Sequence, residues 1–248
     1  MRELYDKAIT DASLDELVNF AKWMNERVGH TPVIVGGWAA YAYVGGFGSK
    51  DIDVIFPDAA VMSKVLADYF HREGYIERRR DFFQKEYYKE TVVKGQKIEI
   101  IIDAASGKRI IEVSGTEARI PWAWAEKHSI KHKLKDVEIY IPEIELLLTY
   151  KMGAILGRSN LLAGAMGERA AYLRSKVWKD AYDILSLSQK DVSSEKLAHF
   201  LKGSRLDGYL AGIDTIVRRY EKDADFAGFY PEYAQKIREI GVLLGSAQ

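Results

Sequence analysis

The chain has 248 residues, 48% of them apolar, and its 36 Lys and Arg residues balance its 36 Asp and Glu residues to a formal net charge of zero. This length and apolar content allow one large domain or two small ones with a real core. The balanced charge argues against non-specific adhesion to nucleic acid, and the absence of cysteine excludes disulfides, thiol nucleophiles and cysteine-based zinc sites.

The N-terminal segment shows no targeting pattern. Residues 1–6 have neither a basic start nor an apolar core of signal length, and no segment of the sequence approaches the roughly 20 apolar residues of a membrane span. Because a chain without cysteine also suits a reducing compartment, we expect a soluble, cytoplasmic protein with no membrane partner.

An amphipathic helix is predicted over residues 13–28. Its apolar residues recur at helical spacing, and Ser13 and Glu16 have the spacing of a capping box. We therefore expect this helix to begin at Ser13 and to cover a sheet.

A short buried strand and a glycine turn follow. Val33, Ile34 and Val35 suit a strand, and Gly36 and Gly37 suit a turn that other residues would adopt only at a cost. The apolar residues 38–44 predict a short helix, and the N–H groups at its start would lie beside the glycines, where phosphate oxygens bind well.

Two alternating carboxylates open the next strand. In the segment Asp51–Phe56, Asp51 and Asp53 share one face because side chains alternate along a strand. Such carboxylates repel each other unless cations lie between them, and two Mg²⁺ ions that also bind a triphosphate would serve this purpose. A two-metal site of this kind supports phosphoryl transfer.

The order of these features resembles the nucleotidyltransferase superfamily related to DNA polymerase β. Its pattern is an apolar residue, Gly-[Gly/Ser], a spacer, and Asp-apolar-[Asp/Glu]-apolar. The resemblance implies a phosphate turn at Gly36 and Gly37, a triphosphate contact by Ser49, and two Mg²⁺ ions held by Asp51 and Asp53. Gly37 occupies a position where many members have Ser.

The resemblance also implies a third carboxylate on a later central strand. Asp58 is expected to cap a helix that ends at Gly74, and alternating segments from there to Asp103 predict further strands. Glu99 and Asp103 share one face of the last of these. We favour Glu99 as the catalytic carboxylate and metal ligand, because a β-branched run continues the strand after it, whereas Asp103 opens a loop and is the alternative.

A second block lies further along the chain. Residues 137–141 alternate like a strand, Pro142 is placed to start a helix over residues 143–158, and a break is expected between Gly157 and Gly167. Another helix is predicted around residues 179–185.

This second block resembles the AbiEii-type toxins and related nucleotidyltransferases. The resemblance implies that Lys151 contacts the triphosphate, with Arg158 as a lesser candidate, that Asp180 is a further catalytic acid, and that a cognate antitoxin-like protein is a partner. A structural alternative is that Asp180 and Asp183 only pair with lysines of the same helix.

These patterns together predict an α/β (α+β) protein. We expect a nucleotidyltransferase core with a small mixed sheet flanked by helices over residues 1–141, and a helical domain over residues 142–248. The main functional hypothesis is Mg²⁺-dependent transfer of a nucleoside monophosphate from a nucleoside triphosphate to an acceptor hydroxyl, with release of pyrophosphate. The acceptor is an RNA end, including tRNA, a protein or a small molecule; the alternative is an inactive nucleotide-sensing or partner-binding subunit.

Overall fold

The computed structural model describes residues 6–29, 32–81 and 83–221. The part of the predicted helical pattern that follows residue 221 lies outside these ranges. The chain forms two compact units. Unit 1 comprises Met1–Arg109 and Pro121–Glu143, and unit 2 comprises Ile110–Ile120 and Ile144–Gln248.

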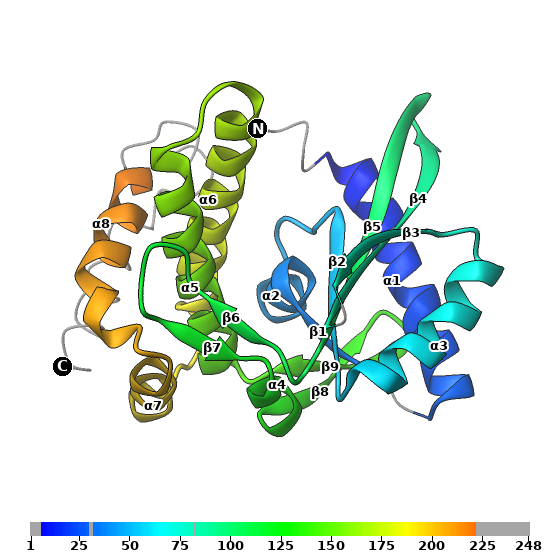
Figure 1. Ribbon diagram of the computed structural model, residues 1–248, viewed down its shortest axis with the longest axis horizontal. Coiled ribbons are helices and arrows are strands. Elements are labelled where there is room, and N and C mark those ends of the chain that lie inside the picture. The colour runs from blue at the N-terminus through cyan, green and yellow to red at the C-terminus, as the bar shows by residue number, and fades with distance from the viewer. Residues whose placement is uncertain (1–5, 30–31, 82, 222–248) are drawn as a thin grey trace. The chain divides into compact units, whose positions relative to one another are not determined.

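Unit 1 is built on a seven-stranded mixed sheet with the strand order β3-β4-β5-β2-β1-β9-β8 (Figure 1). Its elements are α1 (Lys7–Arg27), β1 (Val33–Val35), α2 (Gly36–Val44), β2 (Asp51–Phe56), α3 (Ala59–Arg72), β3 (Ile76–Asp81), β4 (Gln84–Val93), β5 (Gln96–Ser106), α4 (Ala123–Lys127), β8 (Ser129–Leu134) and β9 (Val137–Pro142).

Strand β2 lies at the centre of this sheet. It pairs antiparallel with β1 and parallel with β5, while β4 pairs antiparallel with β5 on its other edge. The two buried residues Ile52 and Val54 of β2 alternate with Asp51 and Asp53, which are half-buried. The alternation predicted from the sequence is therefore confirmed.

Helices α1 and α3 cover one face of this sheet. Phe70 of α3 stacks on Tyr87 of β4 with ring centroids 4.0 Å apart, and Glu16 of α1 accepts a 2.6 Å bond from Lys89 of the same strand. Because Tyr87 and Lys89 point to one face, their neighbours Glu86 and Tyr88 point to the opposite face. The cross-strand register places Asp53 on that opposite face too.

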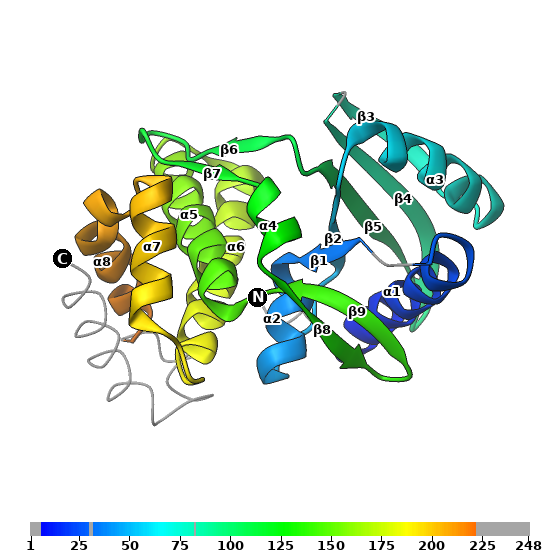
Figure 2. The ribbon, with the colours of Figure 1, turned by 90° about the horizontal axis from the view of Figure 1, so that it is seen from below.

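Unit 2 contains a helical array and a two-stranded hairpin (Figure 2). The hairpin packs along one helix, where Gly153 and Gly157 leave room for Ile120 and Ser114. No helix in the described part of the chain is both long and apolar enough to cross a lipid bilayer. The elements of unit 2 are β6 (Ile110–Glu112), β7 (Arg119–Pro121), α5 (Ile144–Ala163), α6 (Gly167–Leu187), α7 (Ser194–Ser204), η2 (Asp207–Tyr209) and α8 (Leu210–Glu221).

The structure confirms the predicted mixed α/β architecture and corrects two helix boundaries. Helix α1 begins at Lys7, and its N-cap is Asp6, whose carboxylate accepts the N–H of Ala8 at 2.8 Å. The expected capping box at Ser13 is therefore wrong. Helix α5 continues through the expected break after Gly157 and ends at Ala163.

Candidate active site

The turn between β1 and α2 leaves the start of a helix without a side-chain cap. Gly36 has φ +67°, a left-handed conformation that favours glycine, and the N-cap residue Val35 makes no side-chain hydrogen bond. The first N–H groups of a helix have no acceptor within the helix, and they attract anions. This turn is therefore suited to phosphate oxygens.

The carboxylate of Asp53 lies directly against this turn. The antiparallel register of β1 and β2 places Val35 opposite Asp53, so the next residue, Gly36, comes close to the Asp53 side chain. A Cβ atom on Gly36 would overlap Oδ2 of Asp53 and lie 3.0 Å from its Cγ. Glycine is thus needed here for its missing side chain as well as for its backbone conformation.

Ser49 is packed against the second glycine of the turn. A Cβ atom on Gly37 would lie 2.8 Å from Cβ and 3.0 Å from Oγ of Ser49. The Ser49 side chain is 8% exposed, and its hydroxyl forms no hydrogen bond with any residue that the structure describes. Its hydroxyl is therefore available to a ligand at the start of α2.

Ser13 anchors the segment that carries Ser49. Its hydroxyl donates a 3.0 Å bond to the carbonyl of Lys50 and accepts a 3.2 Å bond from the indole N–H of Trp38. Ser13 is fully buried in α1. It thus links α1, α2 and the chain entering β2, which explains why a serine with capping character lies in the middle of a helix.

Asp103 is the ladder partner of Asp53. In the parallel pairing of β2 with β5, Asp53 lies opposite Asp103, whereas Asp51 lies opposite Ile101. Adjacent strands are about 4.8 Å apart, and opposite residues point to the same face. Asp51, Asp53 and Asp103 therefore belong to one face of the sheet.

Glu99 is on the same face but further along β5. It lies four residues before Asp103, which corresponds to about 13 Å along the strand. Arg78 of β3 donates to Glu99 at 2.9 Å and to Glu86 of β4 at 3.2 Å. Since Asp103 lies opposite Asp53 whereas Glu99 is offset from it along the strand, the geometry favours Asp103 over Glu99 as the third carboxylate.

The carboxylate set agrees in chemistry with a magnesium site. Oxygen donors are the ligands that Mg²⁺ prefers, and Mg²⁺ at nucleotide sites commonly takes one or two carboxylates, with substrate phosphates and water completing its shell. Among the residues that the structure describes, no group of three or more His, Cys, Asp or Glu side chains is arranged to hold a metal by itself. Asp51, Asp53 and Asp103 fit a metal that also binds the phosphates.

The predicted residues of the second block come together within unit 2. Lys151 Nζ on α5 lies 3.3 Å from Oδ1 of Asp180 and 2.7 Å from Oδ2 of Asp183, both on α6. Arg158 makes a short contact with Asp180, and Lys179 makes one with Asp183. Because Lys151 and Arg158 are seven residues apart on one continuous helix, they lie two turns apart on the same side of α5, facing α6.

Five residues form this ionic cluster, and they differ in how far they are buried: Lys151, Arg158, Lys179, Asp180 and Asp183. The side chains of Lys151, Lys179, Asp180 and Asp183 are at most 8% exposed, whereas that of Arg158 is 36% exposed. Arg158 is therefore the member of the cluster that solvent reaches most readily.

The same cluster shifts three pKa values. Burial would raise the pKa of Asp180, but Arg158 and Lys151 outweigh burial and hold that pKa below its ordinary value. Burial opposes the charge of Lys151 as well, yet Asp183 and Asp180 raise its pKa. For Lys179 burial prevails and lowers the pKa.

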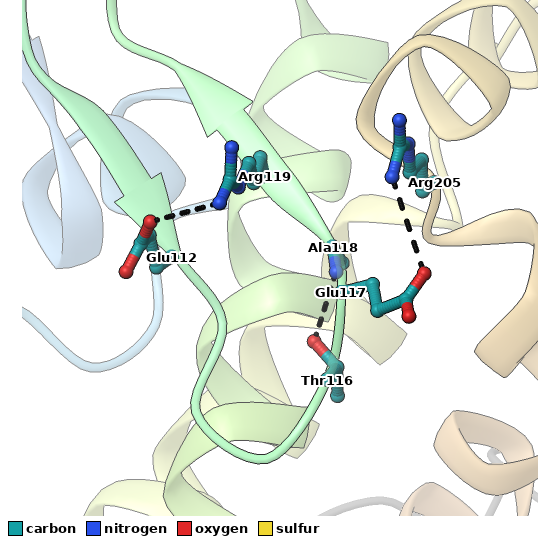
Figure 3. Close-up of a pocket in the computed structure, with 6 residues that line it drawn as sticks. All are labelled: Glu112, Thr116, Glu117, Ala118, Arg119 and Arg205. Atoms are coloured by element: carbon teal, nitrogen blue, oxygen red, sulfur yellow. Dashed lines mark hydrogen bonds and ion pairs between the residues drawn. The ribbon is translucent and has the colours of Figure 1, made fainter.

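A polar hollow of about 400 Å³ also lies in unit 2 (Figure 3). Arg119 lies 3.3 Å from Glu112, and Arg205 lies 4.0 Å from Glu117, with all four side chains mostly exposed. Exposed pairs of this kind contribute about 0–1 kcal/mol to stability. None of the predicted site residues lines this hollow, whose lining consists of Glu112, Thr116, Glu117, Ala118, Arg119 and Arg205.

Comparison with known proteins adds information at the level of the fold. No family model matches the sequence, and no curated protein is significantly similar to it. Among solved structures, a candidate nucleotidyltransferase from H. pylori is 14% identical with a TM-score of 0.50, over 98% of this chain and 95% of its own.

Two further solved structures have TM-scores below 0.50. The protein JHP933 from Helicobacter pylori is 15% identical with a TM-score of 0.49, over 98% of this chain and 93% of its own. An antigenic nucleotidyltransferase-like protein from Paracoccidioides brasiliensis is 11% identical with a TM-score of 0.48, over 87% and 94%. The chain therefore shares the fold of the first H. pylori protein.

Proposed function

We propose that this chain is a Mg²⁺-dependent nucleotidyltransferase that transfers a nucleoside monophosphate from a nucleoside triphosphate to an acceptor hydroxyl. One observation carries the proposal. The carboxylate of Asp53 lies against Gly36 at the uncapped start of α2 and, at the same time, opposite Asp103 on the neighbouring strand. Asp53 thus belongs both to the proposed phosphate-binding turn and to a pair of neighbouring carboxylates.

In unit 1, different residues bind the phosphates and hold the metal ions. The N–H groups at Gly36 and Gly37 and the hydroxyl of Ser49 bind the phosphate oxygens. Asp51, Asp53 and Asp103 would hold two Mg²⁺ ions, which when bound would lower the pKa of the acceptor hydroxyl and neutralise charge on the leaving pyrophosphate.

Asp103 also orients the acceptor hydroxyl and takes up its proton. The acceptor oxygen forms a bond to the α-phosphorus as the bond from that phosphorus to the bridging oxygen breaks. Pyrophosphate leaves with the electron pair of the broken bond.

In unit 2, we propose that Arg158 is a phosphate-binding residue. It is the most exposed member of the ionic cluster, and a guanidinium group matches phosphate oxygens well. Lys151 and Asp180 then act by fixing Arg158 rather than by contact with the triphosphate. From the sequence resemblance of this block to AbiEii-type toxins, we further propose an RNA end as the acceptor and an antitoxin-like protein as a partner.

The function is tested by incubating the protein with each α-labelled nucleoside triphosphate, Mg²⁺, and separate fractions of cellular RNA, protein and small molecules. We expect label to pass to one fraction with pyrophosphate release, and the Asp51→Asn/Asp53→Asn double variant to transfer none. Metal-dependent nucleotide binding without any pyrophosphate release would instead support the nucleotide-sensing subunit. Absence of both binding and transfer would contradict the site.

Gly36→Ala is expected to lower turnover by about 10²-fold, because the new Cβ displaces the Asp53 carboxylate and a shift of about 1 Å in a reacting group has such an effect. Gly74→Ala is the matched control, since Gly74 also has a positive φ, +74°, but has nothing within 4 Å of the added Cβ. Both variants lose about 1–2 kcal/mol of unfolding free energy to backbone strain. Equal turnover in the two variants would contradict the close approach of Asp53 to Gly36.

A further inference from the structure

Gln84 is a polar residue that the sequence did not single out. It is the first residue of β4, and its backbone is fixed by the preceding turn, where Oδ1 of Asp81 accepts the N–H groups of Phe83 at 2.7 Å and Gln84 at 2.9 Å. These two hydrogen bonds fix the backbone from which the side chain of Gln84 extends.

The side-chain amide of Gln84 holds the carboxylate of Asp103. Its Nε2 donates to Oδ1 at 2.7 Å and to Oδ2 at 2.8 Å. The ladder partner of Gln84 is Ala105, so the amide reaches diagonally along the sheet to Asp103, and such diagonal neighbours are within reach of long side chains. Contact with both oxygens holds the carboxylate group in position.

Glu86 and Glu99 on the same face are bonded to a cation instead. Arg78 bonds to Glu86 and Glu99 through its guanidinium group, which offsets one of their two negative charges. The amide of Gln84 brings no charge of its own to Asp103. A neutral amide orients a carboxylate without adding a positive charge beside it.

We infer that Gln84 is a positioning residue, which orients the carboxylate of Asp103 toward a metal-bound nucleoside triphosphate without neutralising it. This inference rests on the proposed function, from which it takes the role of Asp103. It adds a residue on β4 to a site otherwise built from β1, α2, β2 and β5.

The test compares Gln84→Ala, which removes the hydrogen bonds, with Gln84→Lys, which supplies a donor but adds a cation. The first measurement is Mn²⁺ binding to the full chain by calorimetry, with a non-hydrolysable nucleoside triphosphate present. The second is the Mg²⁺ dependence of pyrophosphate release in the presence of the cellular fraction that accepts the label. Gln96→Ala and Gln96→Lys are the controls, because Gln96 is an exposed residue at the start of β5 in the same sheet.

We expect both Gln84 variants to bind Mn²⁺ about 10–100-fold more weakly than the native protein, as is typical when the partner of a metal-ligating carboxylate is lost. The Gln96 variants should bind Mn²⁺ normally. Urea unfolding of each variant separates this effect from loss of the fold, because a purely structural role would lower stability and leave the Mn²⁺ affinity of the folded protein unchanged.

Native Mn²⁺ affinity in Gln84→Ala would overturn the inference, and so would native affinity in Gln84→Lys, because the latter contradicts the need for a neutral partner. If the native protein binds Mn²⁺ but releases no pyrophosphate, the proposed function fails, while the binding data still decide the role of Gln84. If the native protein binds no Mn²⁺, Asp103 faces no metal and the inference fails as well.

Discussion

Asp103→Asn is expected to lower the rate of pyrophosphate release by about 10²–10⁴-fold, the usual contribution of a group that accepts a proton in the reaction. Glu99→Gln is expected to retain activity within about tenfold. The reason is the register of β2 and β5, which places Asp103 opposite Asp53 and leaves Glu99 paired with Arg78. Both changes remove one charge and nearly preserve side-chain shape, so they form a matched pair.

The measurement is the initial rate of pyrophosphate release at saturating nucleotide, with far-UV circular dichroism as the check on folding. If Glu99→Gln abolished the reaction and Asp103→Asn did not, Glu99 would be the third carboxylate. The parallel ladder would then be a poor guide to the site, and the role assigned to Gln84 would fail with it.

Asp180→Asn is expected to reduce the free energy of unfolding by about 3–5 kcal/mol, because it removes one partner from a buried ionic cluster and leaves Lys151 with less compensation. Urea denaturation monitored by tryptophan fluorescence measures this loss. Asp11→Asn is the control, since Asp11 pairs with Lys7 on the exposed surface of α1, where loss of a pair costs about 0–1 kcal/mol.

The same cluster predicts a pH dependence of stability. The pKa of Asp180 is lower in the folded protein than in the unfolded chain, so its stabilising contribution is complete above its ordinary pKa of about 3.9 and is lost as the pH falls through the folded value. The native protein should therefore lose stability in acid more steeply than Asp180→Asn. Parallel acid-unfolding curves would contradict the ionic cluster.

Short-range patterns predicted most of the secondary structure. The strands at residues 33–35 and 51–56 are confirmed, since their apolar and alternating patterns are local properties of the chain. The N-cap at Asp58 is also confirmed, because its carboxylate accepts the N–H groups of Ala60 and Val61, each at 2.8 Å. Such signals are contained within a few residues and need no knowledge of the tertiary fold.

The predictions that were wrong depended on contacts distant in sequence. Ser13 has the spacing of a capping box, but its hydroxyl is engaged by Trp38 and by Lys50, 37 residues further along the chain. The glycines of α5 suggested a break, yet they are where the β6–β7 hairpin packs on a continuous helix. Neither the contacts of Ser13 nor the packing of the hairpin on α5 can be read from the local sequence.

The choice of a third carboxylate shows the same limit. Alternation correctly places Glu99 and Asp103 on one face of β5, but it does not say which residue of a neighbouring strand lies opposite. That information is the register, which depends on how β2 and β5 pair although 39 residues of the chain separate them. Gln84, which reaches Asp103 from a third strand, had no sequence signal other than its place in an alternating segment.

The path of the backbone between the two units limits how the protein can be divided. The chain leaves unit 1 after Arg109, returns at Pro121 and leaves again after Glu143, so three peptide connections join the units. Truncation after Glu143 would strand the β6–β7 hairpin without α5 and expose Val113 and Ile120, which are now at most 3% exposed. Neither unit is therefore a single continuous stretch of the chain, and a separately expressed helical part would have to include this hairpin.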